Sequence, residues 1–182
     1  MTNIANLPIW FSSSTDVNIL DIRAKAVQLH KKANLGILFI DYLQLIEGSH
    51  SKNVNREQQV AQMTRGCKLL TKELGIPVVL LCQLNRESSK SGDKRPQITQ
   101  LRESGAIEQD SDIVVLLHRD INEEGEIEAG TENDAHFKFA KHRGGKTTPW
   151  IKIGYDGPRM RFYDGIKPTK VTEYQPEKST IE

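Results

Sequence analysis

The chain has 182 residues, with 25 Lys and Arg against 24 Asp and Glu, and therefore a formal net charge of +1. A charge so close to zero excludes a whole-molecule field that concentrates a polyanion, so any contact with nucleic acid must be local or shared between subunits. The length suits one domain, and the absence of an apolar run near about 18 residues excludes a membrane span. With two cysteines and no signal segment, we expect a cytoplasmic chain without a disulfide framework.

The first 40 residues predict a strand, a helix and a second strand. Residues 7–11 form a short apolar run, and the hydroxyl side chains at 12–15 predict the cap of the helix that follows. Apolar residues recur at helical spacing from Asp16, and Asn34 predicts the end of this helix. Residues 37–40 are an unbroken apolar run, which is typical of a strand buried on both faces.

The clearest helix opens at Asn55 and ends at Gly75. Its apolar stripe recurs at steps of three and four residues: Val60, Met63, Cys67, Leu70 and Leu74. Residues 76–81 and 113–117 are two further continuous apolar runs, which we predict to be buried strands. A short helical stretch is predicted from Ile98.

The C-terminal part alternates polar and apolar residues, with glycine-containing turns between the runs. The alternating runs are 136–139, 150–153 and 160–163, which predict an antiparallel β-meander. The whole pattern predicts an α/β fold, a mostly parallel sheet covered by helices with this meander at its C-terminal end. We expect one domain over residues 1–167 and a polar tail over 168–182.

Polar side chains stand where two of the predicted strands end. Ligands of such sheets bind outside the carboxyl ends of the strands. Asp41 follows the run 37–40, and a carboxylate in this place holds Mg²⁺ through water in nucleotide hydrolases. Gln83 and Asn85 follow the next strand, and their amides can orient a water or touch a phosphate. The alternatives are a solvated turn carboxylate and ordinary loop amides.

A nucleotide site also needs a phosphate cradle, and the sequence contains no G-x-x-x-x-G-K-[ST] motif. The nearest match, residues 140–147, begins with Ala140 and is followed by a predicted strand instead of a helix. The segment does carry Lys141 and Arg143 two residues apart on a predicted hairpin, which suits contact with the γ-phosphate of a neighbouring subunit. The alternative is a solvated basic turn.

The segment Arg102, Glu103, Ser104 and Gly105, with basic residues shortly before it, could grip a nucleic-acid backbone. Such loops are often only soluble surface, and no aromatic residue is interleaved for base stacking. The five histidines and two cysteines show no ligand spacing, so no zinc site is predicted.

These strand ends resemble those of the DnaB family of replicative hexameric DNA helicases, within the RecA-like ATPases. Residues 38–46 resemble the Walker B segment, and 77–86 resemble the strand that ends in the family's sensor glutamine. The most specific match is 101–112, LRESGAIEQDSD, and 141–145 resemble the finger hairpin. The resemblance covers most of the chain.

The resemblance implies ATP and Mg²⁺ as cofactors. By it, Asp41 orders Mg²⁺, Gln83 senses the γ-phosphate, and Lys141 with Arg143 completes the site of the adjacent subunit in a homo-hexamer. Arg102, Glu103, Ser104 and Gly105 would line a central channel against the phosphates of single-stranded DNA. Six such loops add their fields while each protomer stays near neutral. A helicase loader and a primase are further implied partners.

The resulting hypothesis is a part of a replicative DNA helicase that couples ATP hydrolysis to unwinding and translocation. Family members carry a P-loop and a catalytic glutamate before this region, so we expect the isolated chain to be inactive as an ATP hydrolase. The alternatives are a non-catalytic module that docks on or poisons a helicase ring, and a fragment of another RecA-like ATPase. The strands that flank 37–40 and 76–81 in the family would be absent, which would leave an apolar sheet edge open to pairing. We therefore expect the chain to self-associate.

Overall fold

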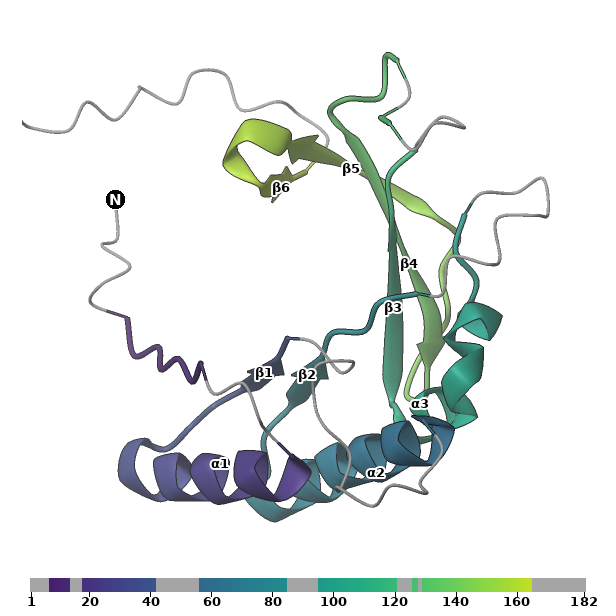
Figure 1. Ribbon diagram of the computed structural model, residues 1–182. Helices are drawn as coiled ribbons and strands as arrows, with labels where there is room; N and C mark the ends of the chain where they lie inside the picture. The colour runs from purple at the N-terminus through teal and green to yellow at the C-terminus, as the bar shows by residue number, and fades with distance from the viewer. Residues whose placement is uncertain are drawn as a thin grey trace, which may run out of the picture. The chain divides into compact units, whose positions relative to one another are not determined.

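The computed structural model describes residues 7–13, 18–41, 56–84, 95–120, 126–127 and 129–164 (Figure 1). Contacts divide the chain into two compact units. The first unit comprises Met1–Ser88 and Ile98–Asp112, and the second comprises Ser89–Gln97 and Ile113–Glu182. The predicted boundary between domain and tail at residue 167 lies outside the described residues.

Helix α1 (Ile19–Ala33) opens the regular structure of the first unit. Its cap is Asn18, whose Oδ1 accepts hydrogen bonds from the N–H groups of Leu20 (2.9 Å) and Asp21 (3.1 Å), while Asp21 accepts from the Asn18 N–H. The prediction that residues 12–15 cap the helix was therefore wrong, because a capping box forms at Asn18 instead. The predicted end is confirmed: Asn34 adopts the left-handed conformation and its N–H donates to the His30 carbonyl.

The strand predicted at residues 7–11 is absent from the structure, which describes this segment without strand pairing. Its backbone hydrogen bonding is local, from the Ile9 N–H to the Leu7 carbonyl at 2.8 Å. Trp10 is about half exposed and Phe11 is 93% exposed. A strand needs a neighbouring strand to satisfy its backbone, and an apolar run alone does not supply one.

Two short parallel strands, β1 (Leu38–Ile40) and β2 (Val78–Leu80), pair with Leu38 opposite Val78 and Ile40 opposite Leu80. Helix α2 (Arg56–Leu74) connects them along the chain, as expected for a parallel pair. The apolar stripe predicted for this helix is confirmed, and its members Val60, Met63 and Cys67 form a buried cluster with Ile40. Gly75, with φ 67°, ends the helix as predicted.

The helices cover one face of this two-stranded sheet (Figure 1). Leu38, Val78 and Leu80 pack against the α2 cluster, together with residues of α1. Phe39 and Val79 point to the opposite face and are 62% and 38% exposed. The prediction that these strands are buried on both faces was wrong within the described residues, because a continuous apolar run does not reveal whether a second layer is present.

The first unit ends in a 3₁₀ segment, η4 (Ile98–Ser104), followed by helix α3 (Gly105–Asp110). The backbone leaves helical geometry at Leu101, where two helical turns meet at a kink, and Leu101 itself is buried. Ile107 of α3 packs against the α2 cluster. The short helix predicted from Ile98 is thus present, in two parts and reaching Asp110.

The second unit is a four-stranded antiparallel sheet in the order β3 (Ile113–His118), β4 (Asp134–His142), β5 (Ile151–Asp156) and β6 (Arg161–Tyr163), with a short 3₁₀ turn η5 (Gly157–Arg159). The α/β class and the C-terminal meander are confirmed. One detail differs: the run at 113–117, predicted as a third buried strand, pairs antiparallel with β4. Its side chains alternate, with Val114 and Leu116 buried and Leu117 59% exposed.

The β3–β4 ladder contains a β-bulge. Val115 pairs with Phe139 and Val114 pairs with Lys141, so Ala140 has no residue opposite it. Such an extra residue bends its strand and re-aims the side chains that follow.

Candidate functional site

Asp41 and Gln83 lie together at the carboxyl ends of the two parallel strands. Asp41 directly follows β1, and Gln83 stands three residues beyond β2. The strands stay joined up to this point, because the Leu81 N–H donates to the Ile40 carbonyl at 2.9 Å. Both side chains line an open pocket of about 370 Å³. The structure thus brings together the two strand-end residues that the sequence singled out.

The other two residues lining this pocket are Leu81 and Cys82. Burial raises the pKa of the Cys82 thiol to about 11, and burial, with the nearby Cys82, raises that of Cys67 to about 11. Both groups are therefore neutral thiols at physiological pH. Cys82 gives the pocket an apolar wall beside the polar ends of Asp41 and Gln83.

The floor of the pocket rests on α2. Ile40, the residue before Asp41, is buried against Met63 and Cys67, and Leu80 and Cys82 pack on the same cluster. Thr64, also buried on this helix, satisfies its hydroxyl by donating to the Val60 carbonyl at 3.0 Å. Close packing of this kind holds side chains in defined rotamers, so the strand ends stand on a rigid base.

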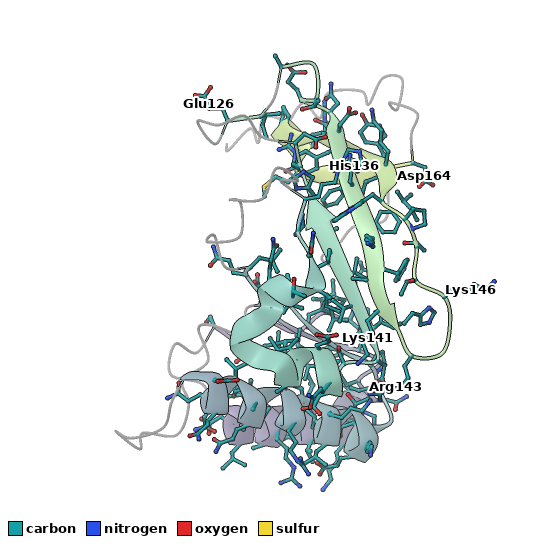
Figure 2. The ribbon with its side chains drawn as sticks, turned by 90° about the vertical axis from the view of Figure 1, so that its right-hand side faces the viewer. Glu126, His136, Lys141, Arg143, Lys146 and Asp164 are labelled. Atoms are coloured by element: carbon teal, nitrogen blue, oxygen red, sulfur yellow. The ribbon has the colours of Figure 1, made fainter. Side chains whose placement is uncertain are left out.

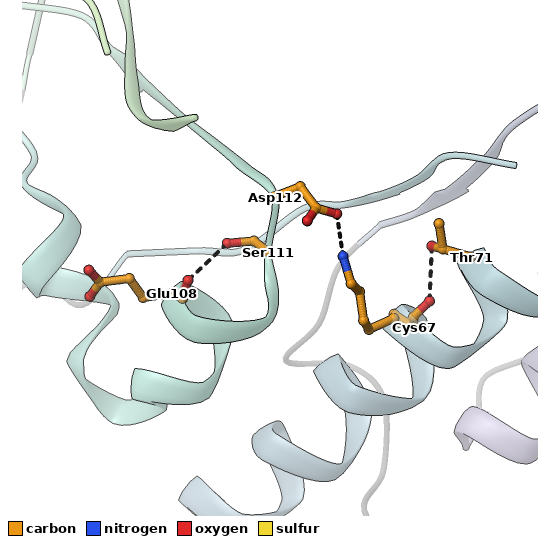
Figure 3. Close-up of polar contacts among 6 residues, drawn as sticks. Cys67, Thr71, Glu108, Ser111 and Asp112 are labelled. Carbon is orange, nitrogen blue, oxygen red and sulfur yellow. Dashed lines mark hydrogen bonds and ion pairs between the residues drawn. The ribbon is translucent and has the colours of Figure 1, made fainter. Parts of the chain in front are cut away.

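The predicted DNA-contacting segment lies on the same unit. Arg102, Glu103 and Ser104 form the end of η4, where the structure describes their backbone only, and exposed Gly105 begins α3. Beyond α3, the Ser111 hydroxyl donates to the Glu108 carbonyl at 3.3 Å, and Asp112 forms an ion pair with Lys68 of α2 (Figure 3). Both η4 and α3 contact α2, and the ion pair of Asp112 with Lys68 adds a further link after the segment.

Lys141 and Arg143 belong to the second unit. Lys141 is in the last part of β4, opposite Val114, and Arg143 begins the turn after the strand. Figure 2 shows both at the same end of the sheet, near Lys146 of the following connection. The prediction that they share a hairpin tip is refined: Lys141 lies within the ladder and Arg143 in the exposed turn. Both have polar or charged interactions within the chain.

Some site features lay beyond sequence reasoning. The ion pair between Lys68 and Asp112 joins residues 44 positions apart, and no spacing signal marks it. Asn85, predicted beside Gln83, lies outside the described residues. In the described part of the chain, no group of three His, Cys, Asp or Glu side chains could hold a metal ion. No helix there has the length and apolar character needed to cross a membrane.

Comparison with known proteins agrees with this arrangement. Residues 1–164 match the family model described as the DnaB-like helicase C terminal domain. The chain is 41% identical over 161 residues to the replicative DNA helicase DnaB of Leifsonia xyli subsp. xyli, covering 88% of this chain and 34% of that protein. It is 43% identical over 147 residues to the DnaB of Mycobacterium intracellulare, covering 81% and 25%. The chain thus spans between a quarter and about a third of the length of these relatives.

Two solved structures share the fold. One is an ATPase domain, with a TM-score of 0.79 and 34% identity, covering 88% of this chain and 56% of that one. The other is a DnaB-like replicative helicase described with its interactions with primase, with a TM-score of 0.75 and 33% identity, covering 84% and 37%. The fold is therefore that of a helicase ATPase domain. Within that class, it belongs to the DnaB-like helicase C-terminal domain family.

Proposed function

We propose that this chain acts as part of a replicative DNA helicase that couples ATP hydrolysis to translocation on single-stranded DNA in a hexameric ring. The observation that carries the proposal is the pocket in which Asp41 and Gln83 meet at the carboxyl ends of β1 and β2. In open α/β sheets this is where nucleotide ligands bind. Membership of the DnaB-like family supports the same assignment.

The two polar side chains of the pocket could supply some of the ligands that Mg²⁺ and a polyphosphate need. Asp41 offers a single exposed carboxylate, which suits a hydrated Mg²⁺ that keeps most of its water ligands. Gln83 offers one amide, which can donate to a phosphate oxygen or accept from a water. ATP, when bound, would supply the phosphoryl group, and these residues would position its magnesium and its terminal phosphate.

Lys141 and Arg143 are proposed to act on a neighbouring subunit. Their place at one end of the antiparallel sheet suits contact with a phosphate that another protomer holds. The Arg102–Gly105 segment is proposed to contact the phosphates of single-stranded DNA, because its backbone is anchored to α2 while Gly105 is exposed. A loader and a primase are proposed as further partners of the parent protein.

We further propose that the chain alone does not hydrolyse ATP, because its sequence lacks a P-loop motif to hold the β- and γ-phosphates. ATPase assays would compare the chain alone with the chain joined to the preceding half of a relative's ATPase domain. We expect activity only in the joined protein, and Asp41→Asn should lower it about 10- to 100-fold, as for residues that act on a metal through water. Lys31→Ala, on the exposed side of α1, is the matched control. ATP hydrolysis by the chain alone would contradict the proposal.

The action in trans has its own test. In mixed rings, subunits carrying Asp41→Asn and subunits carrying Arg143→Ala should restore activity to each other at part of their interfaces. An arginine that stabilises transferred phosphate is worth about 10³-fold or more, so Arg143→Ala alone should be nearly inactive. Absence of complementation would show that Arg143 acts within its own subunit.

A second function is favoured by one observation, the exposed apolar face of Phe39 and Val79 on β1 and β2. A non-catalytic module that docks on a helicase ring would use such a face. Copurification with an intact ring, at fewer copies than ring subunits, would support this function over the first.

A further inference from the structure

Two histidines and one aspartate form a compact cluster in the second unit, outside the proposed nucleotide and DNA sites. His118 of β3 and His136 of β4 are directly opposite each other in the ladder, so both side chains are on the same face of the sheet. Asp120 lies 3.2 Å from His118 Nε2, through Oδ1, and 3.5 Å from His136 Nδ1, through Oδ2. The carboxylate therefore bridges side chains of two adjacent strands.

The cluster is largely shielded from water. The side chains of His118 and His136 are 9% and 11% exposed, and that of Asp120 is 25% exposed. Trp150 adds an aromatic wall, with its ring 6.0 Å from the His118 ring. His136 Nδ1 is buried and makes no hydrogen bond within the described residues, although it faces the carboxylate. A buried polar atom without a hydrogen bond calls for a physical explanation.

Burial is the main factor that opposes a positive charge on His118. Burial lowers the pKa of His118, and Arg95 and His136 lower it further, while Asp120 acts in the other direction. Lys152 of β5 is opposite His136 in the ladder and is paired with Asp134 at 2.6 Å. A proton on His118 would therefore be a buried positive charge, with Arg95 acting against it and one carboxylate, Asp120, in its favour.

We propose that His118, Asp120 and His136 form an acid-sensitive clasp, which joins β3 to β4 while the His118 imidazole is neutral and loosens when His118 takes up a proton. In the neutral state, the His118 Nε2–H donates to Asp120 Oδ1, and the other carboxylate oxygen faces His136 Nδ1. Figure 2 shows His136 at the opposite end of β4 from Lys141, so the clasp lies at one end of the β3–β4 ladder, and Lys141 and Arg143 lie at the other.

The sign of the effect follows from linkage. Because the pKa of His118 is lower in the folded chain than in the unfolded chain, the unfolded chain binds more protons as the pH falls. The free energy of unfolding should therefore be constant above the ordinary histidine pKa and decrease as the pH falls through and below it. This loss comes in addition to the effects of carboxylates, which are titrated at lower pH.

The test measures urea unfolding of the full chain at about pH 7.5 and about pH 5.5, a range in which histidine is the residue that ordinarily titrates. His118→Gln places a neutral amide near the Nε2 position, and His136→Asn places one near Nδ1. Both variants should lose less stability on acidification than the unmodified chain. The control is His30→Gln, since His30 lies in the first unit and contacts the Leu35 carbonyl. An equal loss in all four proteins would overturn the proposal.

Should the variants fail to fold, histidine NMR titration of the unmodified chain gives an independent measurement. We expect the His118 ring to titrate below the ordinary histidine pKa. The amides of β3 near His118 should be less protected from exchange at acid pH, after correction for the pH dependence of the intrinsic exchange rate. Amides at the Lys141 end should change less. Titration of His118 at or above the ordinary value would equally overturn the proposal.

Discussion

Lys68 of α2 and Asp112, which follows α3, form an ion pair that links α2 to the end of the segment proposed to contact DNA (Figure 3). The same helix turn carries Cys67, which is buried beneath the pocket. Thr71, one turn further, donates its hydroxyl to the Cys67 carbonyl at 3.1 Å. One helix therefore supports both candidate sites of the first unit.

The first prediction concerns this ion pair. The Lys68 side chain is 26% exposed and that of Asp112 is 51% exposed, so water screens the attraction. We expect Lys68→Met and Asp112→Asn to be coupled by about 0.2–1 kcal/mol, the range for exposed pairs. A double-mutant cycle in urea unfolding measures this coupling, and Lys72→Met on the same helix is the control. A coupling of zero would show that the pair adds nothing to stability.

The second prediction tests the packing of α1 on α2. A Cβ added at Gly66 would meet Ile19 Cγ1 at 2.3 Å, whereas one at Gly36 would meet nothing within 4 Å. Helix propensity alone favours Ala over Gly by about 1 kcal/mol, but overpacking costs about 1–3 kcal/mol. Gly66→Ala should therefore lower the free energy of unfolding, while Gly36→Ala leaves it nearly unchanged. If Gly66→Ala is stabilising, α1 moves freely enough to accommodate the methyl group.

The third prediction concerns the last strand of the sheet. Gly154 of β5 is opposite Tyr163 of β6, and a Cβ at Gly154 would meet the Tyr163 ring at 2.1–2.5 Å. Gly154→Ala should displace the ring and cost about 1–3 kcal/mol of stability. Thermal unfolding gives the comparison, with Gly144→Ala as a control where no atom lies within 4 Å. Adding Tyr163→Leu should recover part of the loss, and no recovery would place the strain elsewhere.

The fourth prediction concerns the two thiols. Burial raises the pKa of both Cys67 and Cys82 to about 11, so the reactive thiolate is scarce at neutral pH. Relative to an ordinary thiol, the thiolate fraction falls by about a hundredfold. Alkylation by iodoacetamide near neutral pH should therefore be slow in the folded chain and fast after unfolding in guanidinium, as followed by mass spectrometry. Fast labelling of folded Cys82 would mean that the pocket wall opens.

The sequence predicted the arrangement of the first unit where topology alone determines it. Asp41 and Gln83 lie together because two neighbouring parallel strands have their carboxyl ends at the same edge of the sheet. The end of each apolar run in the sequence predicted where its strand ends. The stripe from Val60 to Leu70 was also readable, because helical periodicity directly marks the buried side of α2.

Other features depended on partners that a linear pattern does not identify. The runs containing Phe39 and Val115 were expected to be buried strands, yet these residues are 62% and 45% exposed. An apolar side chain is suited to burial, but whether it is buried depends on whether another layer of the structure packs against it. Likewise, Asn18 and the residues at 12–15 are all good capping residues. Asn18 is the cap in the structure because its side chain and that of Asp21 each accept a hydrogen bond from the other's backbone N–H.

The β-bulge at Ala140 determines on which face of the sheet Lys141 lies. Continuous pairing would set residue 141 opposite Ile113, which is 49% exposed, but the extra residue sets it opposite buried Val114. Successive strand residues alternate between faces, so regular pairing of Ala140 with Val114 would place Lys141 on the other face, whereas deletion of Ala140 would leave Lys141 opposite Val114. The bulge itself, and not the number of residues in β4, therefore decides which face of the sheet carries Lys141.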